Sequence, residues 1–214
     1  MNYLMFVRKV LTTLRVERKV FKEIINDVKI VPNIFNEDYS NYTYPKDFED
    51  YPFFAPPIIV VDKNYIIIDG VKKFLACCEL YVNNKRFEIT IVEYDHIDYR
   101  NDKYRFYVTQ YLLNIHKVEK FDFNIDVVKE MIQDYIYYCI KFNKLQNRFV
   151  NNPTSDEVIK ILKKNSLPLP KIFKKYLNQF VYDNSVLNYV YKKCEFDVLE
   201  FQEKVFEYLN YVIK

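Results

Sequence analysis

The chain has 214 residues, half of them hydrophobic and 29% charged, a composition that indicates a folded globular protein and argues against disorder. Its 32 basic and 29 acidic residues nearly cancel to a net charge of +3, so overall charge alone does not indicate nucleic-acid binding. The four cysteines show neither metal-ligand spacing nor a paired framework, which suits a protein of the reducing cytoplasm.

The N-terminal part combines a basic segment with a proline-rich connection. Its opening apolar run is interrupted by Arg8 and Lys9, so we expect neither a signal peptide nor a membrane span. From Val10 to Ile25 the apolar spacing predicts an amphipathic helix with a basic outer face. Residues 31–57 hold five prolines and many aromatic residues, which predicts an irregular connection.

The clearest structural pattern lies between Ala55 and Asp95. Two short runs rich in β-branched residues, 57–61 and 65–68, predict a strand pair. After Gly70 the apolar spacing changes to that of a helix, and alternating residues from 87 to 91 predict another strand. The whole therefore predicts a strand, a crossover helix and a second, parallel strand. The expected inner face of the helix consists of Val71, Phe74, Leu75, Cys78 and Tyr81.

The only glycine of the chain, Gly70, stands where the strand pair meets the helix. Glycine allows the backbone to turn without a Cβ clash, and the amides that follow it are the open donors of a helix N-terminus, which bind anions. Lys72 and Lys73 fall in the first turn, where their charges oppose the helix dipole unless an anion such as phosphate is bound. Two solvated surface lysines are the alternative interpretation at this point.

This stretch, with its Tyr-x-Ile-Ile-Asp-Gly run, basic pair, amphipathic helix and closing strand, resembles the ParB/sulfiredoxin superfamily. There the glycine and the following basic pair bind nucleotide phosphates. Val71 stands where sulfiredoxins carry their catalytic cysteine, so the resemblance excludes sulfiredoxin activity. The nucleotide-binding residues that the resemblance implies here are Asp69, Gly70, Val71, Lys72 and Lys73.

Residues 108–128 resemble the ParB segment Glu-Asn-x-x-Arg, which is followed by an acidic-hydrophobic helix start. Asn114 and Lys117 occupy the positions of its asparagine and arginine, and the resemblance implies that both complete the nucleotide pocket. Lys117 keeps the positive charge but lacks the planar fork of arginine. Leu113 stands where the family has a glutamate tied to nucleotide turnover, so binding is expected and hydrolysis stays open.

After Tyr99 the apolar spacing predicts helices throughout, with a domain boundary between Leu145 and Pro153. The expected architecture is therefore an α/β, ParB/sulfiredoxin-like nucleotide-binding domain over residues 1–147 and an all-helical domain over 148–214. The last helix, expected over 197–213, either packs into the core of its domain or forms a homodimer contact.

Residues 154–181 are similar to the helix-turn-helix that follows the nucleotide domain in ParB proteins. Thr154 and Glu157 have the spacing of a capping box, and a second helix is expected from Lys171. The resemblance implies duplex DNA as a partner, with a plain helical bundle as the alternative. The side chains suited to phosphates and adenine edges are Lys171, Lys174, Lys175, Asn178 and Gln179.

Three functions remain open from the sequence. The first is a ParB-like protein that binds a nucleotide (CTP, ATP or ADP, with Mg²⁺) and DNA. The second follows from free-serine kinases, a sister branch in which an early acidic residue is the catalytic base; Glu37 is the candidate here, with Asp69 as a magnesium or hydroxyl contact. The third is a degenerate interaction module that binds no nucleotide.

Overall fold

The computed structural model describes residues 14–39, 56–82, 87–142, 154–164 and 167–212. These form two compact units, which divide at Val128. We call them the sheet unit (up to Val127) and the helical unit (from Val128). The boundary expected between Leu145 and Pro153 falls outside the described residues.

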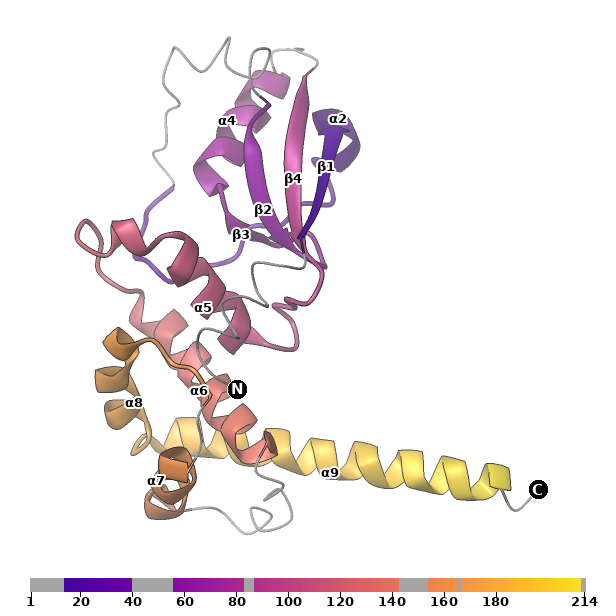
Figure 1. Cartoon of the computed structure of the whole chain (residues 1–214), viewed down its shortest axis with the longest axis vertical. Coiled ribbons are helices and arrows are strands. Elements are labelled where there is room, and N and C mark those ends of the chain that lie inside the picture. Colours follow the sequence, from indigo (N-terminus) through magenta and orange to yellow (C-terminus); the bar gives the residue numbers. More distant parts are fainter. Residues whose placement is uncertain (1–13, 40–55, 83–86, 143–153, 165–166, 213–214) are drawn as a thin grey trace. The chain divides into compact units, whose positions relative to one another are not determined.

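The sheet unit is built on a mixed four-stranded sheet in the order β1-β4-β2-β3 (Figure 1). Its strands are β1 (Leu14–Val20), β2 (Ile58–Asp62), β3 (Ile67–Asp69) and β4 (Glu88–Tyr94). β2 and β3 form the predicted strand pair, which is antiparallel, and β4 lies parallel to β2. The parallel partner of the closing strand is therefore the first strand of the pair, not the strand that leads directly into the crossover helix.

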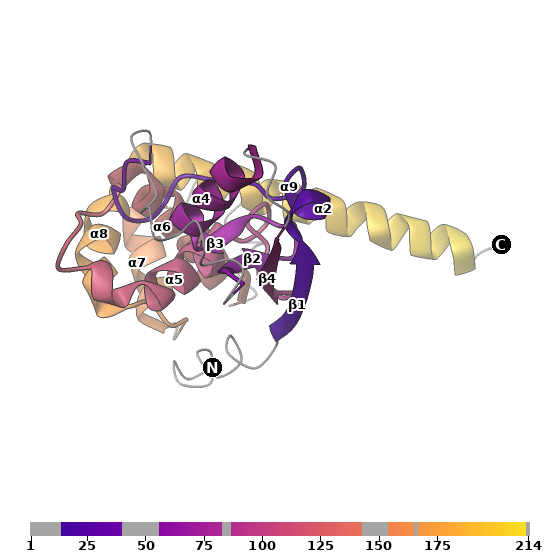
Figure 2. The same cartoon turned by 90° about the horizontal axis from the view of Figure 1, so that it is seen from above.

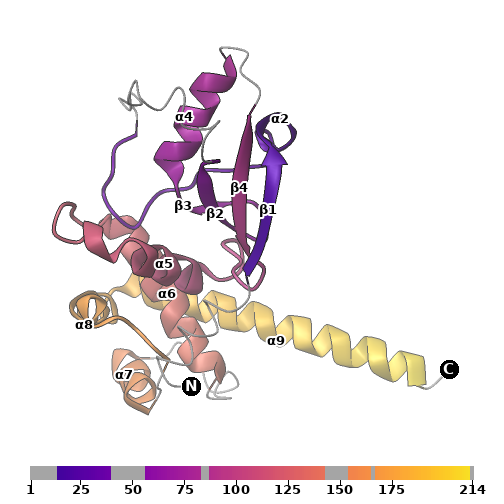
Figure 3. The ribbon, with the colours of Figure 1, turned by 45° about the horizontal axis from the view of Figure 1, so that its top comes forward.

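The crossover helix α4 (Val71–Val82) packs against one face of the sheet (Figure 3). Its buried positions recur at helical spacing, which confirms the predicted amphipathic pattern. The face is rotated slightly from the expected one, because Cys77 is fully buried whereas Cys78 is only partly buried. The fully buried residues of α4 are Val71, Phe74, Ala76, Cys77 and Leu80.

The amphipathic helix expected over residues 10–25 is wrong for the described part of that range. Leu14–Val20 form β1, an edge strand antiparallel to β4, and only Phe21–Ile24 form a helix, α2. Leu14 and Val16 are exposed, so burial does not hold the strand in place. Its backbone groups pair with those of β4, and this non-local pairing overrides the weak helical periodicity.

After Tyr99 the regular elements of the described ranges are all helical, as predicted. The sheet unit contains α5 (Lys103–Leu113) and the 3-10 turn η2 (Ile115–Lys117). Helix α6 (Ile125–Phe142) leads into the helical unit. That unit continues with α7 (Ser155–Lys164), η4 (Lys171–Phe173), α8 (Lys174–Phe180) and α9 (Asn184–Val212). None of the helices described is both long and apolar enough to cross a lipid bilayer.

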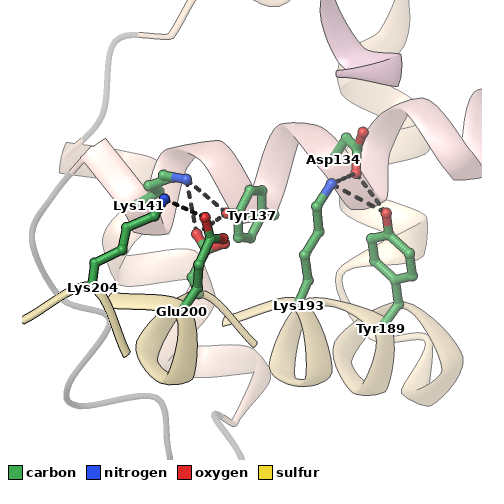
Figure 4. Close-up of polar contacts among 8 residues, drawn as sticks. Asp134, Tyr137, Lys141, Tyr189, Lys193, Glu200 and Lys204 are labelled. Atoms are coloured by element: carbon green, nitrogen blue, oxygen red, sulfur yellow. Dashed lines mark hydrogen bonds and ion pairs between the residues drawn. The ribbon is translucent and has the colours of Figure 1, made fainter. Parts of the chain in front are cut away.

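Helix α9 begins at Asn184, well before the expected start at Asp197. Its first half contacts α6 through Tyr189 and Lys193, both bonded to Asp134 (Figure 4). Its second half extends beyond the other helices of the unit (Figures 1 and 2), and residues 199–207 are exposed. The alternative that this half packs into the core of the unit is therefore wrong for those residues.

Candidate functional site

The turn between β3 and α4 requires glycine for two reasons. Gly70 has a φ of +94°, a conformation that other residues adopt only with strain. A Cβ at this position would also lie 3.2 Å from the carbonyl oxygen of Ile58 and from Cα of Ile59. The Gly70 carbonyl accepts the first helical hydrogen bond, from the amide of Phe74 (2.9 Å). The amides of residues 71–73 therefore open the helix as donors without intrahelical partners.

A pocket of about 290 Å³ lies at this helix N-terminus, entirely within the sheet unit. Three separate stretches of chain, 33–39, 69–73 and 114–117, supply its walls. The structure thus brings together every residue proposed from the sequence for nucleotide binding or catalysis. These residues are Glu37, Asp69, Gly70, Val71, Lys72, Lys73, Asn114 and Lys117. Asn33, Tyr39 and His116 complete the lining.

Glu37 carries the most deeply buried charge of the ion pairs in the pocket, with a side chain that is only 2% exposed. Its Oε1 lies 3.3 Å from Nζ of Lys117 and 3.9 Å from Nζ of Lys72. Within the described residues this oxygen accepts no hydrogen bond. Nζ of Lys72 also lies 5.6 Å from the ring centroid of Phe121. One buried carboxylate therefore faces two lysines in the pocket, and its Oε1 can still accept a hydrogen bond from a ligand there.

Tyr39 and Asn33 extend this cluster, and neither was singled out from the sequence. The Tyr39 hydroxyl donates to Oε2 of Glu37 (2.5 Å), and Nδ2 of Asn33 donates to the Tyr39 oxygen (2.8 Å). Burial, followed by the hydrogen bond to Glu37, raises the pKa of Tyr39 far above its ordinary value. Tyr39 is therefore a neutral phenol. Both residues lie in the irregular proline-rich segment, where no spacing pattern marks them.

Gln110 of α5 fixes the segment that carries Glu37. Its side chain accepts a hydrogen bond from the Ile34 amide (2.7 Å) and donates one to the carbonyl of Ile68 in β3 (3.1 Å). Gln110 is 1% exposed, so these bonds satisfy an amide that would otherwise be costly to bury. The amide of Asn36 adds a bond to the carbonyl of Asp122 (2.8 Å). The only signal for Gln110 in the sequence is a polar residue inside a helix of buried aromatics.

Asn114 and Lys117 reach the pocket from the C-terminal end of α5. Asn114 is 2% exposed, and its Nδ2 donates to the backbone carbonyl of Gln110 (3.0 Å). The chain then turns through η2, because the Lys117 amide bonds to the Asn114 carbonyl (2.8 Å). This turn places the Lys117 ammonium beside Glu37.

The residues proposed for DNA contact lie in the helical unit. All five, Lys171, Lys174, Lys175, Asn178 and Gln179, are exposed on η4 and α8. Phe173 and Phe180 of the same two elements are buried. The capping box before α7 is confirmed, because the Thr154 amide donates to Oε2 of Glu157 (2.9 Å). Residues 165–173 separate α7 from α8, a longer connection than the usual three- or four-residue turn.

No protein-family model and no curated protein matches the chain. Among solved structures, the chain is similar to the pNOB8-like ParB N-domain, with 14% sequence identity over 84% of this chain and a TM-score of 0.38. The C2221 form of the same domain shows 16% identity over 86% of this chain and a TM-score of 0.35. This chain spans 65% of the first of these chains and 69% of the second.

Proposed function

We propose that the pocket binds the phosphate groups of a nucleotide. The observation that carries this proposal is the meeting of the open α4 amides with three lysines, Lys72, Lys73 and Lys117, in one pocket. A helix N-terminus favours anions through its free donors and its dipole, and lysines neutralise phosphate charge. The volume of about 290 Å³ is near the lower end of the range for small-molecule sites, roughly 300–1,000 Å³. That space suits the phosphates better than an entire buried nucleotide.

The carboxylates of the pocket make the proposed ligand a magnesium complex. Glu37 and Asp69 line the same space as the lysines, so a bare phosphate would meet two negative charges there. Mg²⁺ can take a single carboxylate, here Asp69, together with phosphate oxygens, and it removes this repulsion, while Glu37 stays beside Lys117. Asn114 completes the wall beside Lys117. CTP, ATP and ADP are the candidate nucleotides.

A thermal-shift titration with CTP, ATP, ADP and GTP, each with Mg²⁺, tests the proposal. A ligand that binds only the folded state raises the melting temperature. At a concentration one hundred times its Kd, it adds about 2.7 kcal/mol to the free energy of unfolding. We expect the shift to disappear in the Lys72→Ala/Lys73→Ala variant. The matched control, Lys174→Ala/Lys175→Ala, removes two exposed lysines of the helical unit and keeps the shift. No shift with any nucleotide would contradict the proposal.

The exposed face of η4 and α8 supports a second part of this function, binding of duplex DNA. Lys171, Lys174 and Lys175 are free to approach phosphates there, and Asn178 and Gln179 carry amides suited to adenine edges. Affinity should fall steeply with salt, because each neutralised phosphate releases counterions. Each lysine that contacts a phosphate should reduce the salt slope by about 1 when changed to alanine. Lys72→Ala/Lys73→Ala is the reciprocal control and should leave the slope unchanged.

A small-molecule kinase is the second candidate function, and the position of Glu37 favours it. A buried carboxylate beside a phosphate site can accept the proton of an attacking hydroxyl, and Asp69, which lines the same pocket, would hold Mg²⁺. The test is formation of phosphoserine from free serine with ATP or ADP. Glu37→Gln should abolish it while nucleotide binding persists. No product with any nucleotide would remove this candidate, and absence of both binding and product would favour a non-catalytic interaction module.

A further inference from the structure

Tyr39 and Glu37 form a hydrogen-bonded pair of hydroxyl and carboxylate inside the pocket. The 2.5 Å bond runs from the Tyr39 hydroxyl to Oε2 of Glu37, while Oε1 of the same carboxylate faces Lys72 and Lys117. Asn33 donates to the Tyr39 oxygen and thereby fixes its orientation. A nucleophile bonded to a base, with that base held by a further group, is the arrangement that activates side chains for covalent chemistry.

The pair also lies where a phosphoryl donor is expected. Tyr39 and Glu37 line the same pocket as Gly70 and the lysines of the proposed phosphate site. The Tyr39 side chain is half-buried, so water is partly excluded around its oxygen. A small hydroxyl compound is not needed as the phosphoryl acceptor, because the chain itself supplies the Tyr39 hydroxyl at this position.

We propose that Tyr39 is the acceptor of a phosphoryl group from a bound nucleoside triphosphate, so that the protein modifies itself at this hydroxyl. The inference rests on the proposed function, because the donor is the nucleotide held at the Gly70 turn. It differs from the kinase candidate in its acceptor, which belongs to the chain.

The step balances without an oxidant or reductant. The Tyr39 oxygen attacks the terminal phosphorus, and a new P–O bond forms to the phenol. The bond from that phosphorus to its bridging oxygen breaks, and a nucleoside diphosphate leaves. The phenol proton passes along the existing hydrogen bond to Oε2 of Glu37. Lys72 and Lys117, released from Glu37 as it becomes neutral, stabilise the charge on the transferring group.

The experiment uses the full chain with ATP, CTP or GTP and Mg²⁺, followed by intact-mass measurement and peptide mapping. We expect the addition of one phosphoryl group, mapped to Tyr39 in the unaltered protein and absent from Tyr39→Phe. Glu37→Gln should slow the addition at least tenfold, since general bases contribute about 10²–10⁴-fold. Tyr65→Phe is the matched control. Its hydroxyl is bonded to Lys19 rather than to a carboxylate, and its loss should leave the rate unchanged.

The outcomes separate this inference from the function on which it rests. A nucleotide-dependent thermal shift without any mass addition overturns the inference and leaves nucleotide binding in place. No shift and no addition contradict both. Addition that maps to another residue, or that hydroxylamine removes as it does an acyl phosphate on Glu37, also overturns the inference. Because the mapping is done on the unaltered chain, the result does not depend on whether a variant folds.

Discussion

A tyrosine, a buried carboxylate and a lysine meet in both units of this chain, with different results. In the helical unit, Asp134 accepts hydrogen bonds from the Tyr189 hydroxyl (2.8 Å) and from Nζ of Lys193 (2.7 Å), as Figure 4 shows. In the sheet unit, Glu37 accepts a bond from Tyr39 at 2.5 Å, but Lys117 lies 3.3 Å from its other oxygen. The two carboxylates are equally inaccessible, with side-chain exposures of 1% and 2%.

The two clusters differ in whether the carboxylate keeps an oxygen that accepts no hydrogen bond. Lys193 contacts Asp134 directly and also lies over the ring of Tyr137 (4.6 Å to the centroid), so its charge is bonded within the contact between α6 and α9, although its side chain is 26% exposed. Oε1 of Glu37 accepts no hydrogen bond within the described residues and lines a pocket. Residue types alone therefore do not distinguish a structural cluster from a candidate site. A carboxylate oxygen that accepts no hydrogen bond and lines a pocket distinguishes the candidate site.

The largest predicted effect separates the two carboxylates by stability. Asp134→Asn should lower the free energy of unfolding by about 3 kcal/mol, because it leaves the Lys193 charge without its buried partner. Glu37→Gln should change it by less than about 1 kcal/mol, because the amide oxygen can still accept the Tyr39 hydrogen bond, and Lys72 and Lys117 (44% and 22% exposed) line a pocket in which water can solvate them. Urea unfolding of both variants measures the difference. Equal losses would mean that Glu37 contributes as much to the free energy of unfolding as Asp134 does.

Tyr189→Phe provides the control for this comparison. It removes one hydrogen bond to Asp134 but keeps the ion pair with Lys193, so it should cost only about 1 kcal/mol. A loss as large as that of Asp134→Asn would show that the hydroxyl, and not the charge pair, holds α6 against α9.

The next effect concerns the turn that forms the pocket. Gly70→Ala should destabilise the protein by about 1–3 kcal/mol, because a Cβ at φ +94° is strained and would lie 3.2 Å from the Ile58 carbonyl oxygen. Denaturant unfolding measures this loss, and the nucleotide-dependent thermal shift should disappear as well. Lys73→Ala, three residues along the same turn, should leave stability within about 0.5 kcal/mol of the unaltered protein. An unchanged midpoint for Gly70→Ala would contradict the structural requirement for glycine.

Much of this pocket could be predicted from the sequence, because the residues of its central part are adjacent in the chain. A single glycine after a β-branched run, followed by helical spacing from Val71, is sufficient to predict β3, the turn and α4. Asn114 and Lys117 were placed by resemblance, and the structure brings them to the same pocket. Lys174 and Lys175, identified from the sequence as side chains suited to phosphates, are exposed on α8.

The remaining features depend on partners distant in sequence. β1 exists because β4 offers it a backbone edge, which no pattern within 14–20 reveals. Tyr39 and Glu37 reach the pocket because the side chain of Gln110, 76 residues beyond Ile34, ties the Ile34 amide to β3. The early start of α9 has a local cause. Asp183 accepts a bond from the Ser185 amide (2.8 Å) and thereby caps the N-terminus of this helix.

A smaller effect is expected at the capping box of the helical unit. Thr154→Ala should cost about 1 kcal/mol, because the Thr154 hydroxyl accepts the Glu157 amide at the start of α7. Ser155→Ala, the adjacent residue inside the helix, is the matched control and should cost less than half as much. Urea unfolding measures both variants. Equal costs would show that the cap contributes nothing beyond helix propensity.

The smallest effect is a pH dependence at the start of α9. Hydrogen bonds from Lys129 and Ser185 lower the pKa of Asp183 from 3.8 to about 2. Because the folded-state pKa is the lower one, this stabilisation is fully present above pH 3.8 and is lost as the pH falls toward about 2. Asp183 is partly exposed, so solvent screening limits its contribution to less than about 1 kcal/mol.

Urea unfolding of Asp183→Asn across this pH window isolates the contribution. The variant should be less stable than the unaltered protein near neutral pH, and the difference should shrink as Asp183 becomes protonated. Glu195→Gln removes a single exposed carboxylate from the same helix and serves as the control. A difference for Asp183→Asn that stays constant from neutral pH to pH 2 would mean that its cost comes from the changed cap geometry. The ion pair between Asp183 and Lys129 (2.6 Å) would then add nothing measurable to the free energy of unfolding.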